Sequence, residues 1–547
     1  MSRHRPVALV NPPDLDAVYH NVVAVSEHLG LSYIAAVLRR EGIPVVLVDA
    51  DALRLDEAEA IRRTLACEPA MVGITLTFRT VDPAYRIAGR VKAASPDTHV
   101  TVGGQHATFA FREMLGECPA LDSVVRGEGE MTALELARAV LTGSPLEGIK
   151  GLAYRDGADG VALSPPRPLV KDLDRLPFPA RDTLDELIAS QGAFPLVSVL
   201  WTRGCPGACT FCNTHSFYRL GGGPAWRARS VGNILAELEQ LGARYGLRYI
   251  YTTDDNFIGP GELGRSWVIG LAQALIDRDL GISFEVDTRA DSLDEELLAL
   301  LRQAGLASAF IGLEAGTQRL LDTWGKGTSV EENQTAVALL RRHGILYSMA
   351  GFIMFSPYGT LEDVAENTRF LLRLDNATYW NISQSLRLFP GARIIEQLRR
   401  DGLLLPNYSH SMAYGYRFRD PRVGALAQAI RLNYGLEASS ADALHDYVQI
   451  TTLLFERRLA KMGLAGIDGP DLAGFRQATA ACLREMYQAN ASLVLDGVAL
   501  AEAGWNPASF NARAALHRGQ LAEITDRTKE AFQRYLDSVV ALLGGAA

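Results

Sequence analysis

Two kinds of apolar pattern alternate over the first 145 residues. Short continuous apolar runs predict buried strands, and apolar residues recurring every three or four positions predict amphipathic helices. The predicted strands cover residues 7–11, 45–49, 71–77, 99–102 and 124–125, with helices over 31–40, 57–65, 84–94 and 132–141. This order predicts the α/β fold class with a doubly wound parallel sheet, in which ligands bind beyond the carboxyl ends of the strands.

A second strand–helix series starts near residue 194. Its predicted strands cover residues 196–201, 249–253, 283–288, 308–313, 348–355 and 378–386, with helices such as 231–245, 293–304 and 331–343 between them. About six such units are too few for a closed eight-stranded barrel, so the pattern predicts a partial (β/α)6 barrel. Residues 421–545 are predicted to be helical, with interruptions near 463–469 and 504–507.

These patterns divide the chain into four parts: a doubly wound domain over residues 1–148, a hairpin and proline-rich linker over 149–190, the partial barrel over 191–395, and a mostly helical domain over 396–547. Apolar residues make up 48% and charged residues 21% of the chain, which is typical of a folded globular protein. The net charge of −9 gives no general attraction for nucleic acid or anionic lipid. With no bilayer-spanning run and no signal peptide in sight, we expect a cytoplasmic protein without a membrane partner.

Three of the six cysteines lie within eight residues: Cys205, Cys209 and Cys212. Their C-x3-C-x2-C spacing follows a predicted strand, and three thiolates on one tight loop can hold three irons of a [4Fe–4S] cluster and leave the fourth iron open. Structural zinc with His215 as a fourth ligand is the alternative, but zinc usually takes four protein ligands in two paired groups. The remaining cysteines, Cys67, Cys118 and Cys482, are predicted to be buried small hydrophobic residues.

The cysteine triplet at the end of the first barrel strand resembles the radical S-adenosylmethionine (SAM) superfamily. Further stretches similar to that superfamily are Thr252–Phe257, Thr288–Asp291, Gly312–Gly316, Lys326–Thr328 and Leu388–Gly391. Others resemble its cobalamin-binding branch: Gly103–Thr108, Arg126–Glu130 and Leu173–Pro179. The resemblance covers about residues 5 to 395.

This resemblance implies three cofactors: a [4Fe–4S] cluster, SAM and cobalamin. It implies a methyltransferase that moves a methyl group from SAM through methylcobalamin to a carbon of a small molecule, such as a natural product or an amino acid, possibly tryptophan. A flavodoxin- or ferredoxin-like protein is the implied electron donor, and the helical domain is expected to cap the barrel mouth. The alternatives are a cobalamin-assisted rearrangement or cyclisation without methyl transfer, and a non-catalytic cobalamin and Fe–S sensor.

Charged residues mark the expected SAM site. Strand alternation puts Glu285, Asp287 and Arg289 on one face, and three charges are expected to face the barrel interior. By the resemblance Arg289 binds the SAM carboxylate, and Glu285 and Asp287 lie near its ribose or sulfonium; a structural ion-pair network is the alternative. Asp254 and Asp255 are candidates for the SAM ammonium, with a helix N-cap as the alternative.

Two further candidates for the barrel site lie near later barrel strands. Glu314 is a second ribose candidate. Tyr347, with Tyr379 and Trp380, is expected to line a flat aromatic pocket, unless these are plain core residues.

The stretch from Asn11 to His20 lacks the D-x-H-x-x-G motif whose histidine ligates cobalt in many cobalamin domains. We therefore expect cobalamin without a protein histidine ligand. Arg79 or Phe78 is the candidate beneath the corrin, where the positive charge of an arginine would ease departure of a methyl cation equivalent; a surface arginine is the alternative. The residues expected to contact the cofactor are Thr75, Thr77, Gly103, Gly104, Gln105, Gly127 and Glu128. At the glycines, ordinary tight turns are the alternative.

Overall fold

The N-terminal part forms one twisted sheet with a parallel core. The computed structural model describes residues 5–14, 26–157, 160–191, 197–247, 249–349, 351–433, 438, 440–443 and 472–544. Parallel strands β1 (Val7–Asn11), β2 (Val45–Asp49), β3 (Met71–Thr75), β4 (His99–Gly103) and β5 (Ser123–Val125) take the order β2-β1-β3-β4-β5. The hairpin of β6 (Leu152–Asp156) and β7 (Gly160–Leu163) continues the sheet in antiparallel fashion. The predicted parallel sheet and hairpin are therefore confirmed.

Helices cover both faces of this sheet, as the doubly wound prediction requires. On one face, α1 (Leu29–Arg40) and α5 (Gly129–Thr142) pack against residues such as Leu9. On the other face lie α2 (Glu57–Ala66), α3 (Val81–Ala94) and α4 (Gln105–Glu117). Helix α4 was not predicted from the sequence; it begins directly after Gly104 and buries Ala107, Phe111 and Met114.

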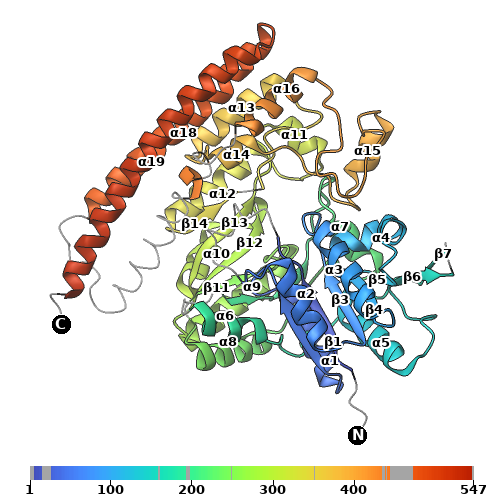
Figure 1. Cartoon of the computed structure of the whole chain (residues 1–547). Helices are drawn as coiled ribbons and strands as arrows, with labels where there is room; N and C mark the ends of the chain where they lie inside the picture. The colour runs from blue at the N-terminus through green and yellow to red at the C-terminus, as the bar shows by residue number, and fades with distance from the viewer. Residues whose placement is uncertain are drawn as a thin grey trace.

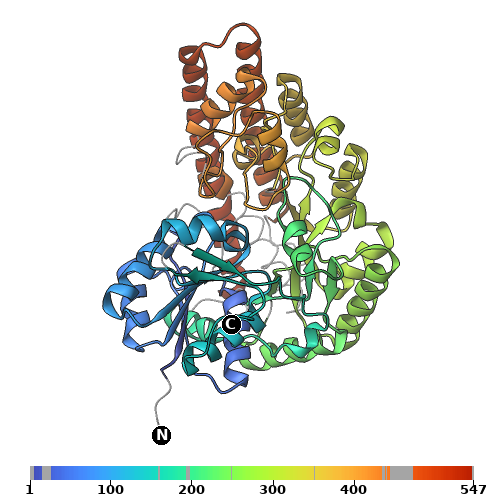
Figure 2. The same cartoon turned by 90° about the vertical axis from the view of Figure 1, so that its right-hand side faces the viewer.

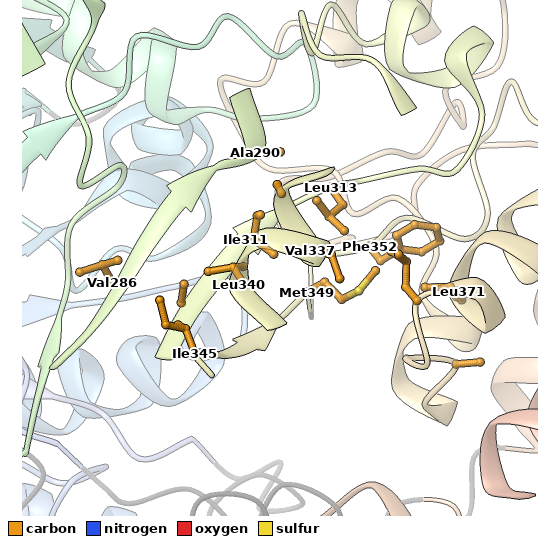
Figure 3. Packing of buried hydrophobic residues seen from close by; sticks show 14 of the residues in the cluster. Val286, Ala290, Ile311, Leu313, Val337, Leu340, Ile345, Met349, Phe352 and Leu371 are labelled. Atoms are coloured by element: carbon orange, nitrogen blue, oxygen red, sulfur yellow. The ribbon is translucent and has the colours of Figure 1, made fainter. Parts of the chain in front are cut away.

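The second sheet is an open, all-parallel partial barrel. Its strands β8 (Val197–Val199), β11 (Tyr249–Thr252), β12 (Ser283–Arg289), β13 (Leu306–Gly312) and β14 (Leu346–Ser348) take the order β14-β13-β12-β11-β8. The helices of the predicted units are α8 (Val231–Tyr245), α9 (Gly261–Arg278), α10 (Glu295–Ala304) and α12 (Val330–Arg342). Figure 3 shows Ile311 of the sheet beside Val337 and Leu340 of α12 in the largest hydrophobic core, to which Val286 also belongs.

The predicted sixth strand over residues 378–386 is largely wrong. Residues Tyr379–Ser383 form the short helix α14, because Thr378 caps it and Asp442 accepts hydrogen bonds from the backbone N–H groups of Tyr379 and Trp380. Only one parallel bridge, between Phe355 and Ser385, extends the barrel in this direction. The fifth predicted strand, over residues 348–355, is also wrong in its bounds, since β14 covers Leu346–Ser348 and shares only Ser348 with it.

The chain leaves the barrel sheet before it reaches the cysteines. After β8, the residues of β9 (Thr202–Gly204) pair with β10 (Trp226–Ala228) in a separate antiparallel pair. The cysteine loop follows β9 and ends at α7 (Thr214–Leu220). The triplet is thus one short strand beyond the barrel strand that was expected to carry it.

The remaining described α-helices belong to the linker, the later part of the barrel segment and the C-terminal part. They are α6 (Asp182–Gln191), α11 (Gln318–Thr323), α13 (Leu361–Arg373), α15 (Ile394–Arg400), α16 (Pro421–Leu432), α18 (Leu472–Glu502) and α19 (Pro507–Gly544). Figure 1 shows α18 and α19 as a long helical pair that runs diagonally along the upper left of the molecule, and the break between them matches the interruption predicted near residues 504–507. The other predicted interruption, at 463–469, lies outside the described residues. Despite the length of this pair, no helix in the described ranges is apolar enough to cross a bilayer.

The N-terminal sheet and the barrel lie side by side beneath the C-terminal helices (Figure 2). Four buried carboxylates and four buried guanidinium groups join these parts. Glu128 and Glu130 of the N-terminal domain pair with Arg203 of β9, and Glu128 also pairs with Arg227 of β10. Because these charges are removed from water, each needs its partner, and the pairs fix how the two sheets face each other.

Candidate functional site

The cysteine loop holds three sulfurs next to two cationic side chains. Cys209 is buried, and its Sγ lies 4.0 Å from Nη1 of Arg289. Burial raises the pKa of the Cys209 thiol, and the positive charges of Lys326 and Arg289 oppose that rise. A Cβ atom on Gly207 would lie 2.8 Å from Nη1 of Arg289 and 3.3 Å from Sγ of Cys205, so glycine is needed for this approach. The donor set and its compensating charges fit a [4Fe–4S] cluster held by three thiolates.

A mononuclear zinc site receives no support. In the ranges that the structure describes, no three His, Cys, Asp or Glu side chains converge on a position for one metal ion. The Nδ1 atom of His215 instead lies 3.1 Å from the carbonyl oxygen of Gly207. Thiolates that each bind a different iron need not meet at one point, so this finding favours the cluster over zinc.

Asp254 and Asp255 hold the backbone around the cysteine loop. Oδ1 of Asp254 accepts hydrogen bonds from the N–H groups of Trp201 (2.8 Å) and Thr202 (2.9 Å), where the chain turns from β8 into β9. Asp255 accepts from the N–H of Gly204 (3.1 Å) and from Oγ1 of Thr214 (3.3 Å), one on either side of the loop. Neither residue is a helix N-cap, so that alternative is wrong.

These contacts leave little of either carboxylate for a ligand. Both oxygens of Asp255 are engaged. Oδ2 of Asp254 is buried and has no hydrogen-bond partner in the described part of the chain. Burial raises the pKa of Asp254 to about 7. A contact of Asp254 with the SAM ammonium therefore stays a prediction, whereas the Asp255 carboxylate has a structural role.

The predicted alternation along β12 is confirmed. Phe284, Val286 and Thr288 are buried on the helix side, and the three charged residues share the opposite face. Oε2 of Glu285 accepts a hydrogen bond from the Tyr249 hydroxyl (3.0 Å). Nη2 of Arg289 donates to the carbonyl oxygen of Lys326 (2.8 Å) and pairs with Asp291. Arg289 therefore forms a structural ion pair and also lies beside the cysteine loop.

Asp287 is the least satisfied acid in the barrel interior. Its Oδ1 atom is buried without a hydrogen-bond partner among the described residues. Burial raises its pKa to about 8, and the charges of Glu285 and Asp254 add to that rise. A carboxylate in this state is stabilised by any cation that enters the interior.

Glu314 and Lys326 form a buried ion pair at the end of β13. Nζ of Lys326 lies 2.8 Å from Oε1 of Glu314, and the backbone of Glu314 has a positive φ of 64°. A Cβ atom on Gly312 would lie 2.7 Å from that oxygen, so the pair requires glycine there. From the sequence, Glu314 was predicted at this strand end, but no role was predicted for Lys326. A buried lysine beside cysteines was not visible without the fold.

Tyr347 does not line the barrel interior. It is paired in register with Ala309, which in turn is paired with Val286, so all three point toward the helices. Its hydroxyl donates to the carbonyl oxygen of Leu374 (2.8 Å) and accepts from Nη2 of Arg341 (2.8 Å). The prediction that Tyr347 lines a pocket inside the barrel is therefore wrong, and the alternative of a core residue holds for it. Tyr379 is also core, since it is fully buried and donates to the carbonyl oxygen of Ile430.

A cavity of about 270 Å³ follows the carboxyl ends of the N-terminal strands. Its lining includes the predicted residues Thr75, Gly103, Gly104, Gln105, Gly127 and Glu128. Thr77 is exposed and is not among the lining residues. Gly104 has a φ of 108°, and a Cβ atom there would lie 3.1 Å from the carbonyl oxygen of Leu76. An apolar slot between a sheet and its helices, entered over glycines, fits the nucleotide tail of cobalamin.

His28 lies in this cavity but is not free to bind a metal. Its Nδ1 accepts a hydrogen bond from the N–H of Leu31 (3.2 Å), so in neutral imidazole the proton is on Nε2. Nε2 lies 3.3 Å from Oγ1 of Thr75, to which it can donate. Burial lowers the pKa of His28, which favours this neutral form. His20 lies outside the described residues.

Glu128 joins the domains and does not point its charge at a cofactor. Its oxygens pair with Arg203 (3.1 Å) and Arg227 (2.8 Å) and accept from the N–H of Val170 (2.7 Å). Although burial alone would raise the pKa of Glu128, the two guanidinium groups hold it below the usual value. The expected cofactor contact at the Gly127–Glu128 turn stays a prediction, and the Glu128 carboxylate already has partners within the protein. Arg203 and Arg227 were missed, although each is an arginine in a short apolar stretch.

Arg79 lies just beyond β3, where it was predicted. Its Nε atom pairs with Oδ2 of Asp14 at 2.7 Å, and both side chains are about one-fifth exposed, at 21% and 20%. The guanidinium is thus held at the carboxyl end of the sheet by an acid that follows β1. The position of Arg79 beneath the corrin stays a prediction.

Comparisons with known proteins agree with these two sites. The chain matches the radical SAM superfamily over residues 199–371 and the B12 binding domain over residues 16–137. It is 32% identical to a Pyrococcus horikoshii protein named an uncharacterized methyltransferase, over 73% of this chain and 84% of that protein. It is 31% identical to an anaerobic magnesium-protoporphyrin IX monomethyl ester cyclase of Rubrivivax gelatinosus, over 61% of this chain and 60% of that protein.

The fold is also that of a solved relative. The cobalamin-dependent S-adenosylmethionine radical enzyme OxsB, with aqua-cobalamin bound, aligns with a TM-score of 0.69 and 20% identity, over 95% of this chain and 84% of that one. The two matched domains imply a [4Fe–4S] cluster, SAM and cobalamin, and the cysteine loop and the glycine-lined cavity fit them. The chain belongs to the cobalamin-dependent radical SAM enzymes.

Proposed function

We propose that this enzyme transfers a methyl group from SAM, through cobalamin, to a carbon atom of a small-molecule substrate. The observation that carries the proposal is the lining of the cofactor cavity. Besides the N-terminal strand ends, that lining includes Arg203, Phe217 and Tyr218, which flank the cysteine loop. The cobalamin that carries the methyl group and the SAM site must face each other. The lining of this cavity runs from the N-terminal strand ends to the residues that flank the cysteine loop. Similarity to a protein named a methyltransferase adds support.

Different residues of the chain would bind the cluster and SAM. When bound, the cluster supplies an electron to SAM and cobalamin carries the methyl group. Cys205, Cys209 and Cys212 would hold the cluster, and Arg289 beside Cys209 would offset the thiolate charge. Glu285 and Asp287 face the interior and would attract the cationic end of SAM. An external flavodoxin- or ferredoxin-like protein would supply the electrons.

The structure gives no support for a tryptophan-like substrate in particular. The expectation of an indole pocket depended on Tyr347, Tyr379 and Trp380. Two of these three have their hydroxyl groups bonded to backbone carbonyls in the helical layer. Only Trp380 stays a candidate, so the proposal is confined to a small organic molecule.

A second candidate is a cobalamin-assisted cyclisation or rearrangement, which the similarity to the ester cyclase favours. Incubation with methyl-labelled SAM, cobalamin, reductant and candidate substrates under anaerobic conditions separates the two. Label in the product together with S-adenosylhomocysteine supports methyl transfer. Formation of 5′-deoxyadenosine and product without label refutes it and supports the second candidate. No SAM consumption would support the non-catalytic sensor.

The cysteine loop gives the first prediction. Changing Cys205, Cys209 and Cys212 together to Ala should abolish iron and sulfide binding after anaerobic reconstitution, because these thiolates are the proposed ligands of three of the irons. Cys67→Ala is the matched control and should keep about four irons. About four irons in the triple variant would contradict the assignment.

A second prediction concerns the lower face of cobalamin. The bound cofactor should show a base-off spectrum without histidine ligation, because both ring nitrogens of His28 have hydrogen-bond partners and His106 is bonded to His410. The variants His28→Ala and His106→Ala, and also His20→Ala, should leave that absorbance spectrum base-off. A histidine-ligated spectrum that disappears in one variant would overturn the prediction.

Arg79 is proposed as the residue beneath the corrin. A guanidinium has no lone pair for a metal, so it fills this position without coordinating. Arg79→Ala and Arg79→Lys should keep cobalamin binding and slow methyl transfer about tenfold, which is about 1.4 kcal/mol of barrier. Occupancy is checked by absorbance. The control is Arg86→Ala, which removes an exposed arginine paired with Glu57 in the same domain. Wild-type rates in both Arg79 variants would place the corrin elsewhere.

A further inference from the structure

Arg387 lies where the two sheets meet, and no acidic residue of the described ranges pairs with it. Arg387 follows the parallel bridge between Phe355 and Ser385, at the carboxyl end of the barrel. Phe389, two residues on, packs edge-to-face on Phe78 of the N-terminal domain, with ring centroids 5.9 Å apart and an interplanar angle of 69°. Since Phe78 follows β3, this contact marks the place where the ligand-binding ends of both sheets face each other.

Aromatic rings hold the Arg387 guanidinium in place. Its Cζ atom lies 5.6 Å from the ring centroid of Phe78 and 5.8 Å from that of Trp380. Nε donates to the Tyr414 hydroxyl (3.2 Å), and Nη2 lies 3.4 Å from Oε1 of Gln384. Both acceptors are neutral. Of the five N–H donors of a guanidinium, these two contacts leave at least three for another partner or for water.

Neutral acceptors alone are unusual for a half-buried guanidinium in this protein's interface. The buried arginines between the domains each pair with a carboxylate: Arg181, Arg203, Arg227 and Arg229. In the described part of the chain, Arg387 has no such pair. Arg431, which lies over the Tyr414 ring at 5.0 Å, also has none within that part. Two positive charges therefore flank one tyrosine, and no acid of the described residues compensates them.

We propose that Arg387, assisted by Arg431, binds an anionic oxygen group of the substrate, either a carboxylate or a phosphate. The inference rests on the proposed function, because it takes the substrate to lie between the cobalamin domain and the barrel mouth. The planar fork of a guanidinium matches both anions in bidentate geometry. Phe78 and Trp380 fix the plane of that fork, so little side-chain freedom is lost on binding. The substrate is thus an anion, and its charge selects it at this point.

Calorimetry on the full chain, reconstituted with cluster and cobalamin at fixed ionic strength, tests this with three probes: benzoate, phenyl phosphate and neutral benzamide. Wild-type protein should bind at least one anion about tenfold or more tightly than benzamide. Arg387→Gln should weaken that anion about tenfold or more, and Arg431→Gln should weaken it less. The matched control Arg417→Gln removes an exposed arginine of the same segment and should bind as wild type. Preference for benzoate identifies a carboxylate, and preference for phenyl phosphate identifies a phosphate.

Equal affinity for the anions and benzamide in the wild type, or anion affinity in Arg387→Gln within about twofold of wild type, overturns the inference. A measurement on wild-type protein removes any dependence on the folding of a variant. Phenylglyoxal labelling with peptide mapping should find Arg387 protected by the bound anion and Arg417 not protected; unchanged labelling of Arg387 refutes the site. Label transfer from SAM is measured separately. Lost anion selectivity with intact cobalamin-dependent SAM turnover therefore counts against this inference alone.

Discussion

The arrangement of both candidate sites depends on the buried ion pairs between the N-terminal domain and the barrel. Arg203 lies between Glu128 and Glu130, and Arg181 of the linker lies between Glu27 and Glu237. Removing such charges from water is costly, so these pairs are weak contributors to net stability. Breaking one is different, because it leaves a buried charge alone at a cost of about 3–5 kcal/mol. The domains therefore have one mutual orientation in which every charge is paired.

That orientation brings the carboxyl ends of two parallel sheets together. In each sheet this is the end where ligands bind. Arg203 contributes twice, since it anchors β9 to the N-terminal domain and also lines the cavity at the strand ends. One residue later the chain reaches Gly204, whose N–H group is held by Asp255, and the cysteine loop begins. The ion pairs, the cavity and the cluster loop are thus connected within three residues of backbone.

The sequence allowed prediction of what depends on local pattern. The order of strands and helices, the alternation along β12 and the spacing of the three cysteines all follow from neighbouring residues. The predictions were wrong where a residue distant in the sequence determines the local structure. Residues Tyr379–Ser383 have apolar and β-prone character, but Asp442, more than 60 positions away in sequence, accepts their first N–H groups and favours a helix. Tyr347 was placed inside the barrel because its strand register was unknown.

The same limit applies to the acids. Asp254, Asp255 and Glu128 are acidic residues at strand ends, which is typical of ligand contacts, yet each is engaged by protein groups that sequence alone could not supply. Glu314 is similar, because the lysine that neutralises it comes from the next loop. An acidic residue near a site can therefore be recognised from the sequence, but whether its charge is available to a ligand depends on the fold.

This distinction leaves Asp287 as the acid best placed for a cationic ligand. Asp255 and Glu128 are neutralised or fully bonded. Asp254 and Asp287 each keep a buried oxygen without a partner in the described part of the chain, but the other oxygen of Asp254 accepts two backbone N–H groups. With a pKa raised to about 8, its carboxyl group is largely protonated near neutral pH as long as the interior holds no cation. A sulfonium or ammonium group entering the interior lowers that pKa and restores the negative charge. Binding of a cation and release of a proton would then be coupled, so we expect the affinity of the interior for a cationic ligand such as SAM to rise as the pH increases toward 8.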